Sequence, residues 1–167
     1  MPAVRDVLVV GAGAAGAAAA IRLAEAKALS VSHPLTGRLV LGCDQTLALG
    51  TTAFHKPVGI AGARSHLEQL SGKTHYLHSG LALVQDGQIL WSHCETARMT
   101  MRHLSADMID AYLDQAGDGI LSCVGAYQLE SLGIHLFERI EGDQSTIIGL
   151  PLLPLLANLR RLLVLKA

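Results

Sequence analysis

"LVLGCDQTLAL", residues 39–49, is the stretch from which the expected architecture follows. Its first part, Leu39–Asp44, is a short apolar run typical of a buried strand. Asp44 ends this run, and ligands of α/β sheets gather at the carboxyl ends of strands. A carboxylate at that point can bind Mg²⁺ or orient a water molecule. From spacing alone, a turn carboxylate that caps the next segment is an equally good interpretation of Asp44.

The segments around this run alternate between helical and extended patterns. Lys73–Val84 and Ile89–Met101 are extended, and Asp86-Gly87 between them is a dipeptide favoured in tight hairpin turns. This order predicts an α/β domain with a mixed central sheet flanked by helices, rather than a bundle or a sandwich. The other expected elements are helices at 14–29, 60–70, from the Ser105 cap onward and from Pro151 to Leu163, strands at 7–10 and 136–140, and a loop at 50–59.

A glycine motif precedes this region. "VLVVGAGAAGAAAA", residues 7–20, contains Gly11, Gly13 and Gly16 in the G-x-G-x-x-G spacing of dinucleotide-binding turns. A complete motif has an acidic residue about 20 positions later, which binds the ribose hydroxyls. Residues 29–38 contain neither Asp nor Glu. The motif is half present, and an FAD- or NAD-binding protein that uses this turn is kept as an alternative function.

Composition limits the classes of partner and compartment. The chain has 167 residues, enough for one domain, and a formal net charge of −1 without runs of Lys or Arg. Nucleic acid and anionic membrane surfaces are therefore not the expected partners. The longest uncharged stretch, residues 7–21, is short for a membrane span, although a signal peptide is a rival interpretation. Three widely spaced cysteines, Cys43, Cys94 and Cys123, predict reduced thiols and a cytoplasmic location.

Two further patterns do not form complete motifs. "SGKT", residues 71–74, ends like a phosphate-binding P-loop, but Leu67 stands where its leading glycine belongs. His75 and His78 lie three positions apart on an expected strand, so they face opposite sides and do not suit one metal site. Both are expected to be ordinary core or surface histidines.

Six segments, in their order and at their spacings, resemble the Maf family of nucleoside triphosphate pyrophosphatases. The resemblance runs from about Leu23 to the C-terminus. It implies an α/β fold of the inosine triphosphate pyrophosphatase type, with the nucleotide in a cleft across the sheet. It also implies hydrolysis of a nucleoside triphosphate to monophosphate and pyrophosphate with a divalent metal, Mg or Mn. The segments are "LAEAKALSVS" (23–32), "LVLGCDQTLAL" (39–49), "FHKP" (54–57), "LEQLSGKTH" (67–75), "VGAYQLESLG" (124–133) and "ERIEGDQSTIIGLPL" (138–152).

The resemblance assigns roles to three charged residues. The acid of the family pattern G-x-D-[TQ], which is the catalytic base, falls on Asp44, the expected metal ligand as well. The lysine of G-K-P falls on Lys56, although His55 replaces the glycine, and the lysine of A-x-x-K-A falls on Lys27. Two ammonium groups can neutralise triphosphate charge that builds up in the transition state.

Two more positions bear on the base of the nucleotide. In the family, the residue after the catalytic acid and one in the A-Y-x-x-[QE] segment vary with the substrate. They are Gln45 and Glu130 here. This pairing resembles the branch that prefers 7-methyl-GTP, and a carboxylate can accept hydrogen bonds from a guanine edge. The alternative for Glu130 is an exposed loop acid.

The chain departs from the family pattern before residue 23. A strand and an S-x-S-x-x-R-R loop are expected there, and residues 1–20 do not match them. We therefore divide the chain into an atypical Ala/Gly-rich segment, 1–22, and a Maf-like domain, 23–167, that is N-terminally incomplete. Loss of one electrostatic donor commonly costs about 10²–10³ in rate, so reduced activity is expected. A non-catalytic nucleotide-binding remnant is a further alternative function. The sequence leaves open whether two copies of the chain form a homodimer.

Overall fold

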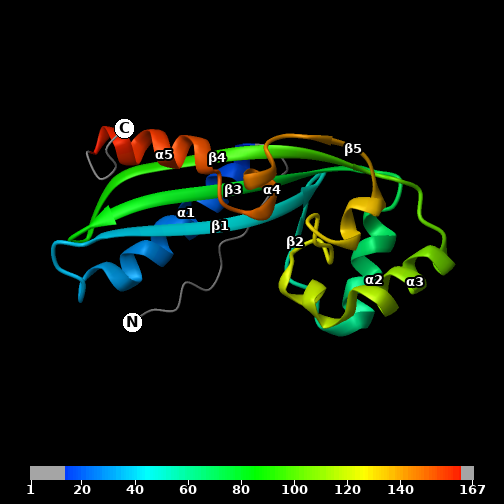
Figure 1. The fold of residues 1–167 in the computed structure, drawn as a ribbon. Helices are drawn as coiled ribbons and strands as arrows, with labels where there is room; N and C mark the ends of the chain where they lie inside the picture. Colours follow the sequence, from blue (N-terminus) through cyan, green and yellow to red (C-terminus); the bar gives the residue numbers. More distant parts are fainter. Residues whose placement is uncertain (1–13, 163–167) are drawn as a thin grey trace.

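A central sheet organises the chain, whose structure is a computed structural model that describes residues 14–162. The described strands form one sheet in the order β2-β1-β3-β4-β5 (Figure 1). All four pairings between them are antiparallel, so the α/β fold is confirmed while the expected mixed pairing is not found. The strands are β1 (Leu39–Leu49), β2 (Thr52–Phe54), β3 (Thr74–Gln85), β4 (Gln88–Met101) and β5 (Phe137–Glu141).

The hairpin between β3 and β4 follows the sequence prediction. Asp86 and Gly87 have φ values of +49° and +76°, the left-handed conformations that a two-residue turn of this kind requires. Such a turn joins antiparallel neighbours, and it fixes the register of the two longest strands. The antiparallel character of the sheet follows in part from this connection.

Strand β1 is longer than the apolar run that predicted it. It continues past Asp44 to Leu49, and Asp44 is paired with Gly80 of β3. The extension occurs because Leu47 and Ala48 are also buried. Asp44 therefore lies inside a strand, so both the strand-end placement and the capping alternative are wrong. The expected loop at 50–59 likewise contains the short strand β2.

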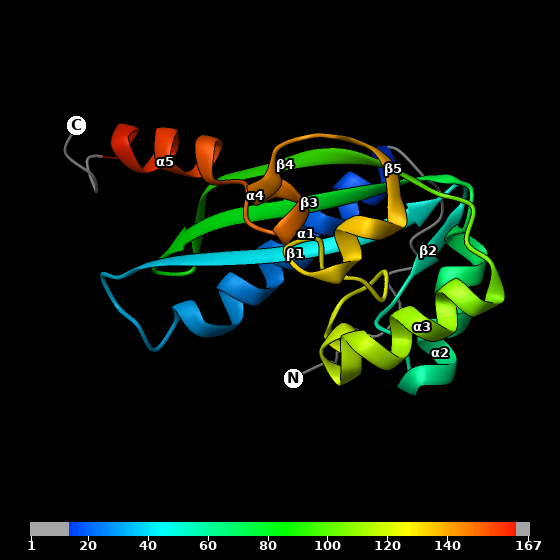
Figure 2. The ribbon, with the colours of Figure 1, turned by 45° about the vertical axis from the view of Figure 1, so that its right-hand side comes forward.

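Helix α1 (Ala14–Ser32) lies along one face of the sheet at very short range (Figure 2). Its buried alanines Ala20 and Ala24 pack directly onto Gly80 and Gly42. A Cβ atom on Gly42 would lie 2.1 Å from the carbonyl oxygen of Ala24, so only glycine allows this approach. The predicted helix at 14–29 is confirmed, and it runs without a break through the expected segment boundary at residue 22.

The opposite face of the sheet carries the remaining layers. Leu81 and Leu83 of β3 pack against α5 (Leu152–Arg161) through Leu155. A larger core joins the sheet to the helices at its other end. These are α2 (Gly59–Leu70), α3 (Ala106–Ala116) and the 3₁₀ turns η1 (Gly117–Ser122) and η2 (Leu132–Leu136). The short helix α4 (Gln144–Ile148) lies against β3 and β4.

Several local predictions on this side are confirmed. Ser105 caps α3 by accepting a hydrogen bond from the Met108 N–H, and Pro151 directly precedes α5. The expected strand at 7–10 and the glycines Gly11 and Gly13 lie outside the described residues. No helix within residues 14–162 has both the length and the apolar character needed to cross a membrane.

Candidate active site

One cavity of about 310 Å³ brings together every residue that the sequence proposed for the site. Lys27 of α1, Asp44 and Gln45 of β1, Lys56 after β2 and Glu130 after η1 all line it. These residues are spread over more than a hundred positions of the chain, so the fold alone places them around one space. Val124, Gly125, Tyr127 and Ile147 form the less polar parts of the wall.

Asp44 and Gln45 enter the cavity from different faces of β1. Successive side chains on a strand point to opposite faces. Asp44 meets Lys27 on the α1 side, whereas Gln45 bonds to carbonyl groups of α4 on the other side. The β1–β2 pairing covers only Leu47–Leu49, so no described strand pairs with the outer edge of β1 beside Asp44. The cavity therefore reaches around the sheet edge, and two neighbouring residues serve separate parts of it.

Lys27 and Asp44 form an ion pair at one end of the cavity. The Lys27 ammonium donates to Asp44 Oδ1 and also to the carbonyl oxygen of Cys43, at 3.3 Å. The lysine side chain is 59% exposed and the aspartate 18%. The ammonium is therefore free to turn toward a ligand, while the carboxylate stays within the cavity wall.

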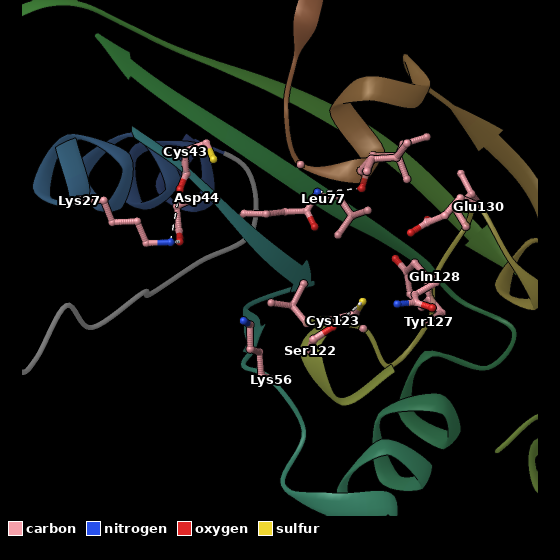
Figure 3. A pocket seen from close by; sticks show the side chains of 17 residues that line it. Lys27, Cys43, Asp44, Lys56, Leu77, Ser122, Cys123, Tyr127, Gln128 and Glu130 are labelled. Carbon is pink, nitrogen blue, oxygen red and sulfur yellow. Dashed lines mark hydrogen bonds and ion pairs between the residues drawn. The ribbon is translucent and has the colours of Figure 1, made fainter. Parts of the chain in front are cut away.

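Lys56 and Glu130 lie on different sides of the cavity (Figure 3). Lys56 is exposed and approaches from the side of β2, on the same half of the view as Lys27 and Asp44. Glu130 is also exposed and lies on the opposite half, above Gln128 in this view. The lysine end therefore carries two ammonium groups and the Asp44 carboxylate, a formal excess of one positive charge, whereas Glu130 carries a negative charge at the other end.

Gln45 is held more firmly than the sequence indicated. Its amide nitrogen donates to the carbonyl oxygens of Thr146 and Ile147, at 3.2 and 3.0 Å, and to Ser79 Oγ at 3.0 Å. Thr146 in turn donates its hydroxyl to Glu95 at 2.7 Å. Sequence reasoning missed Ser79, Thr146 and Glu95, because their contacts with β1 and with each other join β3, β4 and α4. The only available clue was that Thr146 lies within one of the segments that resemble the Maf family.

A buried pair supports the wall near Glu130. Tyr127 OH and His75 Nε2 are 2.8 Å apart, and both side chains are buried. Desolvation lowers the pKa of His75 to about 4 and raises the pKa of the Tyr127 phenol. Both groups are therefore neutral around pH 7, and their hydrogen bond stabilises the segment that leads to Glu130.

The chain belongs to the Maf family, since the profile of Maf-like proteins matches residues 7–162. More specific names come from its relatives. A protein of Nitrobacter winogradskyi named nucleoside triphosphate pyrophosphatase is 58% identical over 141 residues, which is 84% of this chain and 70% of that protein. A 7-methyl-GTP pyrophosphatase of Brucella abortus is 57% identical over 139 residues, 83% of this chain and 70% of that protein. A 7-methyl-GTP pyrophosphatase of Rhizobium johnstonii is 54% identical over 151 residues, with 90% and 76% covered.

These relationships confirm the family resemblance. The profile match begins at residue 7, within the segment that the sequence pattern set apart as 1–22. The division of the chain at residue 22 stays a prediction. Gly16, the third glycine of the dinucleotide-like motif, has a packing role in α1, because a Cβ atom there would lie 2.6 Å from the His78 ring.

Proposed function

We propose that this chain hydrolyses nucleoside triphosphates to the monophosphate and pyrophosphate in the cavity beside Asp44. The observation that carries this proposal is the shared cavity with opposite charges at its two ends. A nucleoside triphosphate has the matching polarity, with a polyanion at one end and a hydrogen-bonding base at the other. The names of the related Nitrobacter and Brucella proteins support the same reaction.

The lysine end would bind the triphosphate. Lys56 faces no carboxylate partner among the described residues, and Lys27 can exchange Asp44 for a phosphate oxygen because its side chain is exposed. Fixed positive charge near the transferring phosphoryl group stabilises the transition state. The departure of Lys27 would also release the Asp44 carboxylate to act on water.

Asp44 is the proposed general base. A water molecule attacks the α-phosphorus and passes a proton to the Asp44 carboxylate. The bond from the α-phosphorus to the α–β bridging oxygen breaks, and pyrophosphate leaves with that oxygen. A base must lie within hydrogen-bonding reach of the water that it deprotonates. Asp44 meets this need because it is fixed in the β1–β3 ladder at the cavity wall.

The donor groups at this end fit a divalent ion that arrives with the substrate. Within residues 14–162 no group of three His, Cys, Asp or Glu side chains could hold a metal by itself. Mg²⁺ commonly binds through one or two carboxylates together with substrate phosphates and water. We propose that Asp44 supplies the protein ligand to Mg²⁺ or Mn²⁺. The ion would neutralise charge on the phosphate oxygens.

The opposite end would receive the base. Glu130 places a carboxylate there, and a carboxylate accepts hydrogen bonds from the N–H groups of a guanine edge. Methylation at N7 makes guanine cationic, which strengthens its attraction to an acid. Together with the names of the Brucella and Rhizobium relatives, this charge favours 7-methyl-GTP as a substrate.

The test is pyrophosphate release from a panel of nucleoside triphosphates with Mg²⁺ or Mn²⁺. We expect Asp44→Asn to abolish turnover while nucleotide binding persists, because the amide cannot take a proton from water. Asp114→Asn, on the exposed surface of α3, is the matched control and keeps full turnover. Turnover by the Asp44→Asn protein at the parent rate contradicts the proposal. Binding without turnover by the parent protein identifies the chain as a nucleotide-binding remnant instead.

The compartment and the partners belong to the same proposal. Cys43, Cys94 and Cys123 are all free, which suits a reducing compartment such as the cytoplasm. A net charge of −1 without basic runs favours a small nucleotide over nucleic acid or a membrane surface as the partner. A homodimer stays a prediction that sedimentation of the purified protein can test.

A further inference from the structure

We propose that Thr146 is a positioning residue that turns the Gln45 amide so that this side chain offers the base an acceptor and no donor. This inference rests on the proposed function, because it assigns the base to the end lined by Gln45 and Glu130. It adds a residue that does not line the cavity. It also gives a chemical rule for the bases that the site selects.

The first step is the orientation of Gln45. Its amide group has two hydrogens, and three protein acceptors surround the nitrogen: Ser79 Oγ and the carbonyl oxygens of Thr146 and Ile147. The Ser79 hydroxyl donates its hydrogen to the Thr146 carbonyl oxygen at 2.7 Å. Its oxygen can therefore only accept from Gln45. A reversed amide would place oxygen against two carbonyl oxygens, and this repulsion fixes the orientation.

The orientation of the Gln45 amide decides which of its atoms can bond to a ligand. With both hydrogens engaged, Gln45 has no donor left, and its side-chain oxygen is its remaining polar atom. Among the described residues that oxygen accepts no hydrogen bond from the protein. Glu130, the other polar side chain assigned to the base, is an acceptor when ionised. Gln45 and Glu130 therefore offer the base acceptors and no donors.

The carbonyl groups that bind Gln45 are held in place by a bond from α4 to the sheet. They belong to α4, a helix of five residues that is too short to hold its place by itself. Thr146 is buried, and its hydroxyl donates to Glu95 Oε2 of β4 at 2.7 Å. This bond fixes α4 against the sheet, and the Thr146 carbonyl of the same residue then fixes Gln45.

The consequence is selection by the donor groups of the base. Guanine presents an imino N–H and an amino group on one edge, and both can donate to Gln45 and Glu130. Uracil and thymine present carbonyl oxygens on either side of one N–H, and these oxygens would face acceptors without a hydrogen between them. Facing acceptors repel each other, and an oxygen left without a donor beside the half-buried Gln45 is costly, so the arrangement disfavours such bases. The site should select donor-rich purines.

The direct test is NMR spectroscopy of the ¹⁵N-labelled full chain. The Gln45 side-chain amide signals are assigned by their loss in Gln45→Leu. We expect both hydrogens to exchange slowly with water and to keep their shifts when GTP is added without metal. Rapid exchange, or a large shift on nucleotide binding, would show that the amide donates to solvent or ligand and would overturn the inference. This measurement does not require turnover. It can therefore succeed or fail whether or not the chain hydrolyses nucleotides.

A variant series tests the anchor. Thr146→Val keeps the shape but removes the hydroxyl, and Thr146→Ser restores it. We expect Thr146→Val to lower the ratio of kcat/KM for GTP over UTP about tenfold, and Thr146→Ser to recover it. Thr100→Val is the control, because it removes a comparable hydroxyl bond to Thr74 elsewhere in the sheet. An unchanged ratio in Thr146→Val, with amide exchange as slow as in the parent, overturns the role of Thr146.

Discussion

Lys27 of α1 and Asp44 of β1 form an ion pair that joins the helix to the sheet at one end of the cavity. The pairing depends on the close approach of α1, because Gly42 and Gly80 leave no side chain between helix and strands. It keeps an ammonium group beside the carboxylate that we propose as the general base. The close packing of α1 on the sheet therefore places a charge that the chemistry of the site uses.

Replacement of Lys27 by methionine tests the role of its charge separately from the packing of α1. The aliphatic stem is kept and the charge is lost, so we expect kcat/KM for nucleoside triphosphates to fall about 10–100-fold. The midpoint of urea unfolding should change little, since ion pairs with exposed partners contribute little to stability. Steady-state kinetics and urea titration measure the two effects.

The matched control is Lys73→Met. Lys73 donates to the carbonyl oxygen of Gln69 on the exposed surface and does not line the cavity. Loss of the Lys73 charge should leave kcat/KM within twofold of the parent value, because surface substitutions away from the site generally have small effects. If the two lysine variants lose the same amount of activity, the phosphate-binding role of Lys27 is wrong.

Gly42 and Gly62 should respond in opposite directions to alanine. Gly42→Ala forces a Cβ atom to within 2.1 Å of the Ala24 carbonyl oxygen, so α1 must move and the free energy of unfolding should fall by about 3 kcal/mol or more. Gly62 lies in α2 with its nearest neighbour 3.5 Å from such an atom. Gly62→Ala should raise the free energy of unfolding by about 0.5–1 kcal/mol, because alanine favours helix.

Thermal and urea unfolding of both variants measure this contrast. Gly42→Ala should also lose nucleotide turnover, since displacement of α1 carries Lys27 away from Asp44. A Gly42→Ala protein with the stability and activity of the parent would contradict the close approach of α1 to β1 at Gly42.

Much of the fold could be predicted from local patterns. The β3–β4 hairpin was indicated by Asp86-Gly87, and α2 and α3 by apolar spacing, because these features depend on neighbours in the sequence. The length of β1 could not be predicted in the same way. Its second half is stabilised by pairing with β2 and β3 and by burial of Leu47, which are contacts with distant segments.

The candidate site shows the same division. Asp44, Lys56 and Glu130 were found from their place in family-like segments, and the structure places them around one cavity. The support for Gln45 was missed, because the bonds that join Ser79, Thr146 and Glu95 cross three separate elements. Polar contacts of this kind have no fixed spacing along the chain, so a single sequence does not reveal them.

The cysteines should differ in reactivity toward iodoacetamide. Burial and the neighbouring Glu95 raise the pKa of Cys94 to about 11, which leaves little of the reactive thiolate at pH 8. Cys123 lines the cavity, so it should react faster than Cys94 and should be protected by bound nucleotide. Peptide mass spectrometry over a time course measures each rate. Equal labelling of Cys94 and Cys123, unaffected by GTP, would contradict both the raised pKa of the half-buried Cys94 and the place of the nucleotide.

His75 should make the stability of the core depend on pH in the acid range. Desolvation lowers the pKa of His75 in the folded protein to about 4, whereas the unfolded chain binds a proton near the ordinary value of 6.5. The unfolded state therefore holds more protons between these values, and stability falls as pH drops from 6.5 toward 4. His75 alone should lower the free energy of unfolding by about 3 kcal/mol as the pH falls through this window. Above pH 7 it should add no dependence on pH.

Urea unfolding at intervals from pH 7.5 to 4.5 measures this dependence. His75→Gln keeps a polar partner for Tyr127 but does not titrate, so its unfolding free energy should depend less steeply on pH below 6.5. His135→Gln, on the exposed part of η2, should keep the steep dependence of the parent. The buried His78, whose pKa is also lowered by desolvation, is present in all three proteins and contributes equally to them. Identical slopes for the parent and His75→Gln would show that His75 takes up its proton without loss of the folded core.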